Sequence, residues 1–199
     1  MLFGAQAEIK ELSDDSGEAV LARAQAGDVE AFGLLFERHH RFVYKFVYAM
    51  RGEQVAAEEL TQETFLVAYK NIRNLRGEAK LKTWLCAIAK NVVYKSFRSQ
   101  SKEGFPIADE IESFDLPDEK TLAPDREILS KELNSAIGAA LKKLDEDKRL
   151  VFTLKELQYL SYKEISEITG SGVPKLKTDL RRAKIEMRAL LEPYLEAGK

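Results

Sequence analysis

Residues 161–191 read SYKEISEITGSGVPKLKTDLRRAKIEMRALL, and their pattern decides the fold of the C-terminal part of the chain. A short helix is predicted over residues 161–169, followed by a tight glycine turn over residues 169–172. Pro174 suits the first turn of a second helix, where its missing N–H needs no partner, and Pro193 is expected to end that helix after about residue 191. The face that this second helix buries is predicted to consist of Leu176, Leu180, Ala183 and Met187. The whole is the pattern of a helix-turn-helix, which is a moderately specific signal.

The second of these helices carries a large excess of positive charge. Its cations are Lys175, Lys177, Arg181, Arg182, Lys184 and Arg188, and they face only two acids, Asp179 and Glu186. Lys177, Arg181 and Lys184 recur at helical spacing, opposite the predicted buried face. Long cations on such a helix suit the major groove of duplex DNA, where they reach phosphates and guanine edges. For this helix alone, a solvated amphipathic surface is an equally good interpretation.

The remaining apolar residues also recur with a helical period. Helices are predicted over residues 18–36, with a break at Gly27-Asp28, and over residues 39–50, 56–73 and 80–98, with a break at Gly77. Two more are predicted over residues 125–143 and 147–158. No stretch alternates as a strand would, so the predicted fold class is all-α.

Charge and proline divide the chain into two small helical domains. Residues 101–127 hold three prolines and nine acidic residues against three basic ones, which predicts an acidic flexible linker, with apolar residues that would also let it dock on a partner. The domains then span residues 18–100 and 128–199, and each has a net positive charge. Residues 1–17 form an N-terminal extension with no assigned structure. This segregation says more about partners than the overall net charge of −2.

Within the first domain, residues 70–98 are rich in both cations and aromatic side chains. The cations are Lys70, Arg73, Arg76, Lys80, Lys82, Lys90, Lys95 and Arg98, against the single acid Glu78. Tyr69, Trp84, Tyr94 and Phe97 lie among them. Unpaired bases stack on such rings beside a basic groove, so the segment predicts single-stranded nucleic acid binding. The alternative is a core packed around Trp84 with solubilising lysines, and for Trp84 itself the core is favoured.

The stretch 53–65, EQVAAEELTQETF, is acidic on one face. Glu58, Glu59, Gln62 and Glu63 have no evident role in the core. They form either an ordinary solvated face, with acids favoured near a helix N-terminus, or a docking surface for a basic protein.

Composition and motifs argue against several other classes of protein. The single cysteine, Cys86, excludes a disulfide framework or a cysteine zinc cluster, and its apolar helix predicts a buried, inert thiol. His39 and His40 are adjacent, so on a helix they diverge and cannot easily share one metal. There is no glycine-rich phosphate loop, no apolar run of about 18 residues and no secretory signal. We therefore expect a cytoplasmic nucleic-acid-binding protein that is not an enzyme and has no cofactor, metal, small-molecule substrate or membrane insertion.

Four segments together resemble a known family. GDVEAFGLLFERH (27–39), AAEELTQETFLVAYKNI (56–72) and LRGEAKLKTWLCAIAKN (75–91) resemble region two of the sigma-70 family in its extracytoplasmic-function group. LKKLDEDKRLVFTLKELQYLSYKEISEITG (141–170), with the basic helix after it, resembles region four. The matching order and the acidic linker support the resemblance, which covers about four-fifths of the chain.

This resemblance implies a sigma factor that directs bacterial core RNA polymerase to a specialised set of promoters and is controlled by an anti-sigma factor. Docking on the clamp helices of the largest polymerase subunit is implied for Glu58, Glu59, Gln62, Glu63 and Phe65, and docking of region four on the polymerase flap is expected as well. Melting and binding of the downstream promoter element as single-stranded DNA is implied for Lys80, Lys82, Thr83, Trp84, Asn91, Tyr94, Lys95 and Arg98. Binding of the upstream element as duplex is implied for Lys175, Lys177, Thr178, Arg181, Arg182 and Lys184.

The sequence departs from the family pattern at three places. Ala56-Ala57 replaces the usual acidic start of the docking motif, Asp179 stands where relatives carry a cation, and the turn GSGVPK is unusual. An acid facing phosphates would repel them, although it could accept from a cytosine amino group. Two other classes of function stay open at this point. A stand-alone helix-turn-helix regulator would bind duplex tightly without polymerase, and a metal-dependent enzyme would rest only on His39 and His40.

Overall fold

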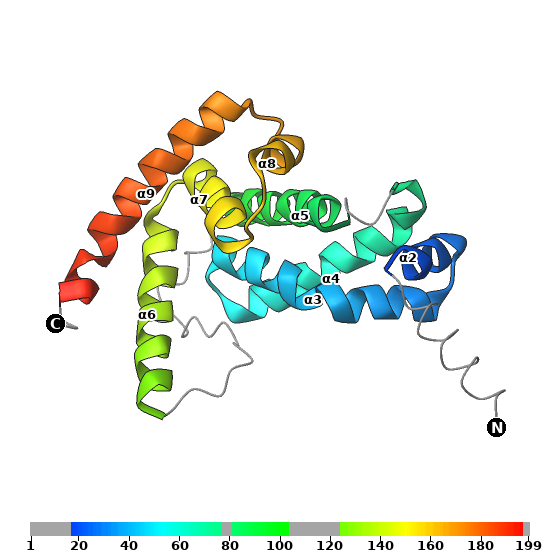
Figure 1. Cartoon of the computed structure of the whole chain (residues 1–199), viewed down its shortest axis with the longest axis horizontal. Helices are drawn as coiled ribbons and strands as arrows, with labels where there is room; N and C mark the ends of the chain where they lie inside the picture. The colour runs from blue at the N-terminus through cyan, green and yellow to red at the C-terminus, as the bar shows by residue number, and fades with distance from the viewer. Residues whose placement is uncertain (1–16, 77–80, 104–123, 197–199) are drawn as a thin grey trace, which may run out of the picture.

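The computed structural model describes residues 17–76, 81–103 and 124–196, and within these segments all regular structure is helical (Figure 1). Four features predicted above lie outside the described residues: the N-terminal extension up to residue 16, the break at Gly77, the candidate Lys80 and the linker residues 104–123. The all-α prediction is confirmed. The described segments 17–103 and 124–196 are called the N-terminal half and the C-terminal half below.

Three long helices and two short elements build the N-terminal half. They are α2 (Gly17–Ala26), α3 (Val29–Arg51), α4 (Gln54–Asn71), the 3-10 turn η1 (Ile72–Asn74) and α5 (Leu81–Glu103). The predicted break at Gly27-Asp28 is confirmed, because the Asp28 carboxylate accepts from the backbone N–H groups of Glu30 and Ala31 and so caps α3. The segments predicted separately at 18–36 and 39–50 are joined in the structure. After the cap at Asp28, α3 runs without a break from Val29 to Arg51. It ends at Gly52, whose φ of 69° is left-handed.

The C-terminal half consists of α6 (Pro124–Lys143), α7 (Glu146–Phe152), the π-helical turn η3 (Thr153–Leu157), α8 (Tyr162–Thr169) and α9 (Val173–Glu196). The Ser161 hydroxyl and the Glu164 carboxylate form a capping box at the start of α8, and Gly170 ends it in a left-handed conformation. The predicted helix-turn-helix is therefore present as α8, its glycine turn and α9.

Helix α9 is longer than predicted, because Pro193 lies inside it and does not end it. A proline at this position removes the hydrogen bond to the carbonyl four residues earlier, at Ala189. Both residues are exposed on the last turns of the helix, so water can satisfy that carbonyl. The expectation that Pro193 stops the helix was wrong for this reason.

The two halves share one continuous hydrophobic core. Its buried residues come from α2–α5 and, in the C-terminal half, are Leu150, Val151, Leu154, Leu160, Ile165, Ile168, Leu176 and Leu180. A smaller cluster joins Ala49 of α3 to α6 and α9 through Leu141, Ala183 and Met187. Figure 1 shows α8 lying against α5, with α6 and α9 beyond the end of α3, while α7 packs on α9 and contacts α3. The four residues predicted for the buried face of α9 are all buried.

Candidate nucleic-acid and polymerase interfaces

The exposed side of α9 is cationic. Lys177, Arg181, Arg182 and Lys184 are all exposed. Lys177, Arg181 and Lys184 each follow a buried residue, so their row lies about 100° around the helix from the buried row and not opposite it as predicted. A shallow groove runs beside them, lined by Tyr162, Lys177, Leu180, Arg181, Lys184, Ile185 and Arg188. The Lys177 ammonium lies 5.7 Å from the centre of the Tyr162 ring, and the Thr178 hydroxyl donates to the Pro174 carbonyl. This surface combines exposed cations with a shallow groove, which a recognition helix can use to contact phosphates and base edges.

Asp179 does not act as the free acid expected from the sequence. Its carboxylate lies 2.7 Å from the Lys175 ammonium, which also contacts Asp147 of α7 at 3.1 Å. These hydrogen bonds, first to Asp179 and then to Asp147, raise the pKa of Lys175. Only 13% of the Asp179 side chain is exposed. The expected repulsion of phosphates is therefore reduced, and Lys175 is held by two acids.

Helix α5 distributes its predicted DNA-binding residues over different sides. Asn91, Lys95 and Arg98 are exposed on one side. Thirteen residues separate Lys82 from Lys95, which at 3.6 residues per turn places them about 140° apart. Lys82 accordingly lies away from that group, with its ammonium 5.6 Å from the centre of the Phe42 ring. The structure thus brings together only part of the predicted set.

Three other members of that set are wholly or partly buried. Trp84 packs against the core, as favoured from the sequence. Thr83 is buried, and its hydroxyl donates to the Glu164 carboxylate of α8 at 3.3 Å. Tyr94 is half-buried and forms a T-shaped ring pair with Phe97. In this arrangement Thr83 is covered by the C-terminal half.

The acidic face predicted on α4 exists. Glu58, Glu59 and Gln62 are exposed along one side of the helix. The half-buried Glu63 accepts from Lys95 of α5 at 3.1 Å, so a predicted polymerase contact and a predicted DNA contact partly neutralise each other. The departure from the family at Ala57 has a physical reason, because this residue is fully buried and could not carry an acid there.

Phe65 is not a surface residue of this face. It is 5% exposed, and its ring meets Phe36 edge-on at 4.8 Å between centres. The expectation of direct polymerase contact by Phe65 is corrected to packing that positions α4. Leu66, an exposed apolar side chain on the same helix, was not predicted, although its spacing of four residues from Gln62 was the available signal. Tyr69, predicted among the aromatic side chains of the basic segment, is also exposed.

Cys86 is a buried side chain and His39 is half-buried. Cys86 is fully buried, and burial, with a smaller contribution from Glu164, raises its pKa to about 12. Burial and then the nearby cations Lys82 and Arg38 lower the pKa of His39, so the imidazole is neutral. In residues 17–76, 81–103 and 124–196 there is no cluster of three side chains suited to a metal ion. None of the helices described is both long and apolar enough to cross a membrane.

Polar contacts between the two halves centre on α5 and Arg149. The Lys90 ammonium donates to the Ile168 carbonyl at 2.8 Å. The Arg149 guanidinium donates to the carbonyls of Met50 in α3, at 2.8 Å, and of Lys142 and Leu144 at the end of α6, at 2.6 and 3.0 Å. Burial is the main cause that lowers the pKa of Arg149, although it remains a cation at any physiological pH.

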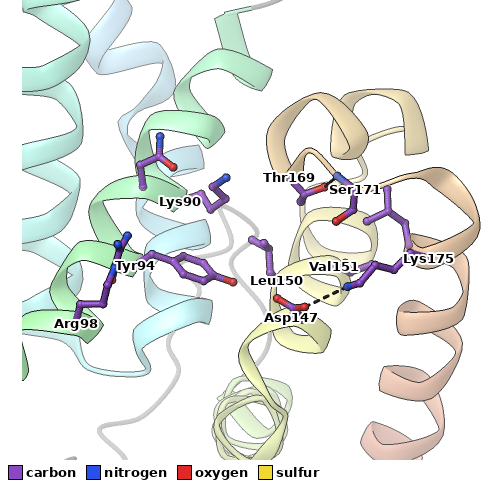
Figure 2. Close-up of a pocket in the computed structure, with 11 residues that line it drawn as sticks. Lys90, Tyr94, Arg98, Asp147, Leu150, Val151, Thr169, Ser171 and Lys175 are labelled. Atoms are coloured by element: carbon purple, nitrogen blue, oxygen red, sulfur yellow. Dashed lines mark hydrogen bonds and ion pairs between the residues drawn. The ribbon is translucent and has the colours of Figure 1, made fainter. Parts of the chain in front are cut away.

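A pocket of about 220 Å³ remains between the halves (Figure 2). On one side Lys90, Tyr94 and Arg98 extend from α5, and on the other lie Asp147, Thr169, Ser171 and Lys175. Burial, and then the negative charges of Asp147 and Glu146, raise the pKa of Tyr94 to about 12. This part of the interface is open rather than close-packed, and its lining mixes polar side chains with Leu150, Val151 and Leu176.

The fold and these charged surfaces define an all-helical protein with a helix-turn-helix and two further charged faces. Family models of sigma-70 region 2 and sigma-70 region 4 match residues 35–103 and 134–187. The chain is 31% identical to the ECF RNA polymerase sigma-E factor of Haemophilus influenzae over 89% of this chain and 96% of that protein. It is 26% identical to the RNA polymerase sigma-H factor of Pseudomonas aeruginosa over 92% and 98% of the two chains. The sigma factor RpoE of Bartonella quintana, solved in complex with the anti-sigma factor NepR, has a similar fold, with a TM-score of 0.67, 22% identity, and coverage of 82% of this chain and 98% of that one.

The chain therefore belongs to the extracytoplasmic-function group of the sigma-70 family and is an RNA polymerase sigma factor. This family membership confirms the resemblance inferred from the sequence. Sigma factors are initiation factors and not enzymes, so the chemistry of RNA synthesis is the polymerase's.

Proposed function

We propose that each charged surface of this sigma factor contacts a different part of a transcription initiation complex. In this proposal the acidic face of α4, centred on Glu58 and Glu59, docks on the clamp helices of the largest subunit of core polymerase. The exposed side of α5 binds the melted downstream promoter element, and α9 binds the upstream element as duplex. The C-terminal half also docks on the polymerase flap, and the protein acts in the cytoplasm.

The observation that carries this proposal is the exposed row of Lys177, Arg181 and Lys184 on α9, which lies about 100° around the helix from the buried row that anchors it. Arg181 and Arg182 are the best placed of the row, since neither is engaged by the ion pairs that occupy Lys175 and Lys184. Guanidinium groups bind guanine edges and phosphates with two hydrogen bonds each, which suits sequence recognition. The two arginines are therefore the principal candidates for contacts with the upstream element.

Weak contacts at both promoter elements add up when they are joined through one chain and one polymerase. Once one half has bound its promoter element, the other half is held near its own element at a high effective concentration. Neither half therefore needs to bind promoter DNA tightly alone. A stand-alone regulator would instead bind duplex tightly in the absence of polymerase. An anti-sigma factor is proposed as the controlling partner, supported by the family and by the complex of the similar Bartonella quintana protein.

Transcription in vitro tests the proposal. Core polymerase and this protein are incubated with a library of promoter fragments, and the transcripts are sequenced. We expect initiation at a defined set of sites, and Arg181→Ala and Arg182→Ala to reduce it at least tenfold by weakening upstream contacts. The matched control is Arg38→Ala on α3, remote from α9, which should transcribe as the wild type does. Unchanged transcription by both α9 variants would contradict the assignment.

A further inference from the structure

We propose that Gln25 of α2 is a positioning residue for binding of the melted promoter strand, because its side chain fixes the turn η1 near the start of the basic segment 70–98. The inference rests on the proposed binding of the melted element at α5 and extends that surface to η1. It gives a role to α2, which has no contact with DNA or polymerase in the proposed function. Two contacts between α2 and η1, and the side chains that η1 exposes, support it.

The side-chain amide of Gln25 holds η1 by two backbone carbonyls. Its Nε2 group donates to the Ile72 carbonyl at 3.1 Å and also to the Leu75 carbonyl. An amide nitrogen carries two N–H donors, so one group can satisfy both acceptors at once. Ile72 is the first residue of η1 and Leu75 is the residue that follows the turn, so the two hydrogen bonds span the whole of it. One side chain of α2 thus fixes the backbone at the end of α4.

Gly27 brings a second part of α2 against the same turn. Its φ of 101° favours glycine, and a Cβ at this position would come within 3.4 Å of the Arg73 guanidinium. The backbone N–H of Gly27 donates to the Ala24 carbonyl, so this glycine lies at the C-terminal end of α2, where the helix dipole favours a cation. Arg73 is therefore placed by α2 as well, while its side chain remains exposed.

Helix α2 can serve as a support because it is anchored in the core. Its residues Val20, Leu21 and Ala24 are buried there. The helix packs on both α3 and η1 (Figure 1). Burial of this apolar side fixes α2 against its neighbours, so the half-buried Gln25 projects toward η1 from a fixed position.

The turn that Gln25 holds buries its apolar side chains and exposes its cations. Ile72 and Leu75 are buried, whereas Arg73 and Arg76 are exposed. Among the described residues, no ion pair engages either arginine. Guanidinium groups bind phosphates and stack on bases, which are the two kinds of contact that a single strand offers. The directions of both guanidinium groups depend on the backbone of η1, and therefore on Gln25.

Positioning matters at this place because a single strand is flexible. Binding orders the strand and also the side chains that hold it, and each long side chain that is immobilised adds to the cost. With Gln25 in place, the backbone that carries Arg73 and Arg76 is ordered before DNA binds. Without the two donors of Gln25, η1 keeps the hydrogen bond from the Leu75 N–H to the Ile72 carbonyl but loses its polar link to α2.

The test compares complexes of core polymerase with the wild type and with Gln25→Met, which has a side chain of similar length and no N–H donor. The probe is a single-stranded oligonucleotide with the non-template downstream sequence of a promoter found by the transcription library. We expect Gln25→Met to bind it about fivefold more weakly, at unchanged affinity for core polymerase and unchanged helicity by circular dichroism. The matched control, Ala22→Met on the exposed side of α2, should bind as the wild type does.

The salt dependence of binding gives a readout that a purely structural role would not change. Gln25→Met removes no charge, so simple electrostatics predicts an unchanged slope of log affinity against log salt concentration. If Gln25 positions Arg73 and Arg76, the slope should become shallower, because their phosphate contacts are lost. Weaker binding with an unchanged slope would contradict the inference.

A double-mutant cycle separates positioning from a general loss of stability. Arg73→Gln/Arg76→Gln removes both guanidinium groups, and adding Gln25→Met should then weaken binding no further. Losses that multiply in the cycle, or wild-type binding by Gln25→Met, would overturn the inference. Arg98→Gln on α5 tests the proposed function separately. Weaker binding by Arg98→Gln with wild-type binding by Gln25→Met would overturn the inference alone, and wild-type binding by both would overturn the proposed function of α5 as well.

Discussion

The guanidinium of Arg149 lies 2.8 Å from the carbonyl oxygen of Met50, although 99 residues separate the two in the chain. Because the same group also donates to two carbonyls at the end of α6, one half-buried side chain ties together α3, α6 and α7. The relative placement of the two halves therefore depends on a residue that carries no DNA or polymerase contact in the proposed function.

Removing this guanidinium should destabilise the whole protein. Arg149→Met leaves buried carbonyls without a donor, and we expect it to cost about 2–4 kcal/mol and to lower Tm by about 5–10 °C. Thermal unfolding followed by circular dichroism measures this. Arg181→Met on the exposed side of α9 is the control and should change stability by less than about 0.5 kcal/mol. Equal Tm values for the two variants would show that Arg149 does not hold the halves together.

Tyr159 should be a site where a smaller residue is stabilising. It has a φ of 57°, a left-handed conformation that costs an L-residue about 1–2 kcal/mol, and 85% of its surface is exposed. Tyr159→Gly relieves that strain and loses little packing, and after the entropy cost of glycine we expect a gain of about 0.5–1 kcal/mol. Denaturant unfolding measures it. Tyr159→Ala keeps a Cβ in the strained conformation and should show no such gain, so an equal gain in both variants would rule out backbone strain as the cause.

Asp179 should limit the affinity for the upstream element by engaging Lys175. In Asp179→Asn the ammonium keeps only Asp147 as an acidic partner and can turn toward phosphate. We expect the complex with core polymerase to bind upstream duplex several-fold more tightly. The slope of log affinity against log salt concentration should steepen by the amount that about one additional phosphate contact contributes. Titrations at several salt concentrations, with Glu192→Gln as a control on the same helix, measure this. An unchanged slope would place Lys175 outside the DNA interface.

Alkaline pH should open the protein through Tyr94. The pKa of this phenol is raised from 10 to about 12 in the folded state, so its contribution to stability is complete below pH 10 and is lost as the pH rises toward 12. The unfolded fraction of the protein, and the rate at which a thiol reagent labels the buried Cys86, should therefore increase between pH 10 and 12. Tyr94→Phe removes the ionisable hydroxyl and should reduce the increase. A variant with the same pH profile as the wild type would exclude Tyr94 as the group responsible.

The sequence was most informative where structure is local. The glycine turn, the buried face of α9 and the exposed acids of α4 follow from periodicity and capping within a few residues, and all were predicted. Features that depend on distant contacts were not. The buried Thr83, for example, donates its hydroxyl to Glu164, which lies 81 residues later in the chain.

Two errors show the limits of local patterns within single helices. Phe65 lies beside the exposed acids in sequence, but its ring meets Phe36 of α3, so its direction depends on how α3 and α4 pack. Asp179 pairs with Lys175 at the local spacing of four residues, which the prediction overlooked, whereas the second acid on that lysine, Asp147, comes from α7 through tertiary packing. Charge patterns thus located the surfaces, while tertiary packing determined which side chains remain available on them.

The central claim, that the acidic face of α4 docks on core polymerase, is tested most directly by titrating bacterial core polymerase with fluorescently labelled protein. The wild type should form a one-to-one complex, and the double variant Glu58→Lys/Glu59→Lys should bind at least tenfold more weakly through like-charge repulsion. Glu192→Lys, which reverses a charge at the far end of α9, should bind as the wild type does. Loss of binding in the α4 variant alone would establish this face as the docking surface. Equal affinity for all three proteins would contradict the account.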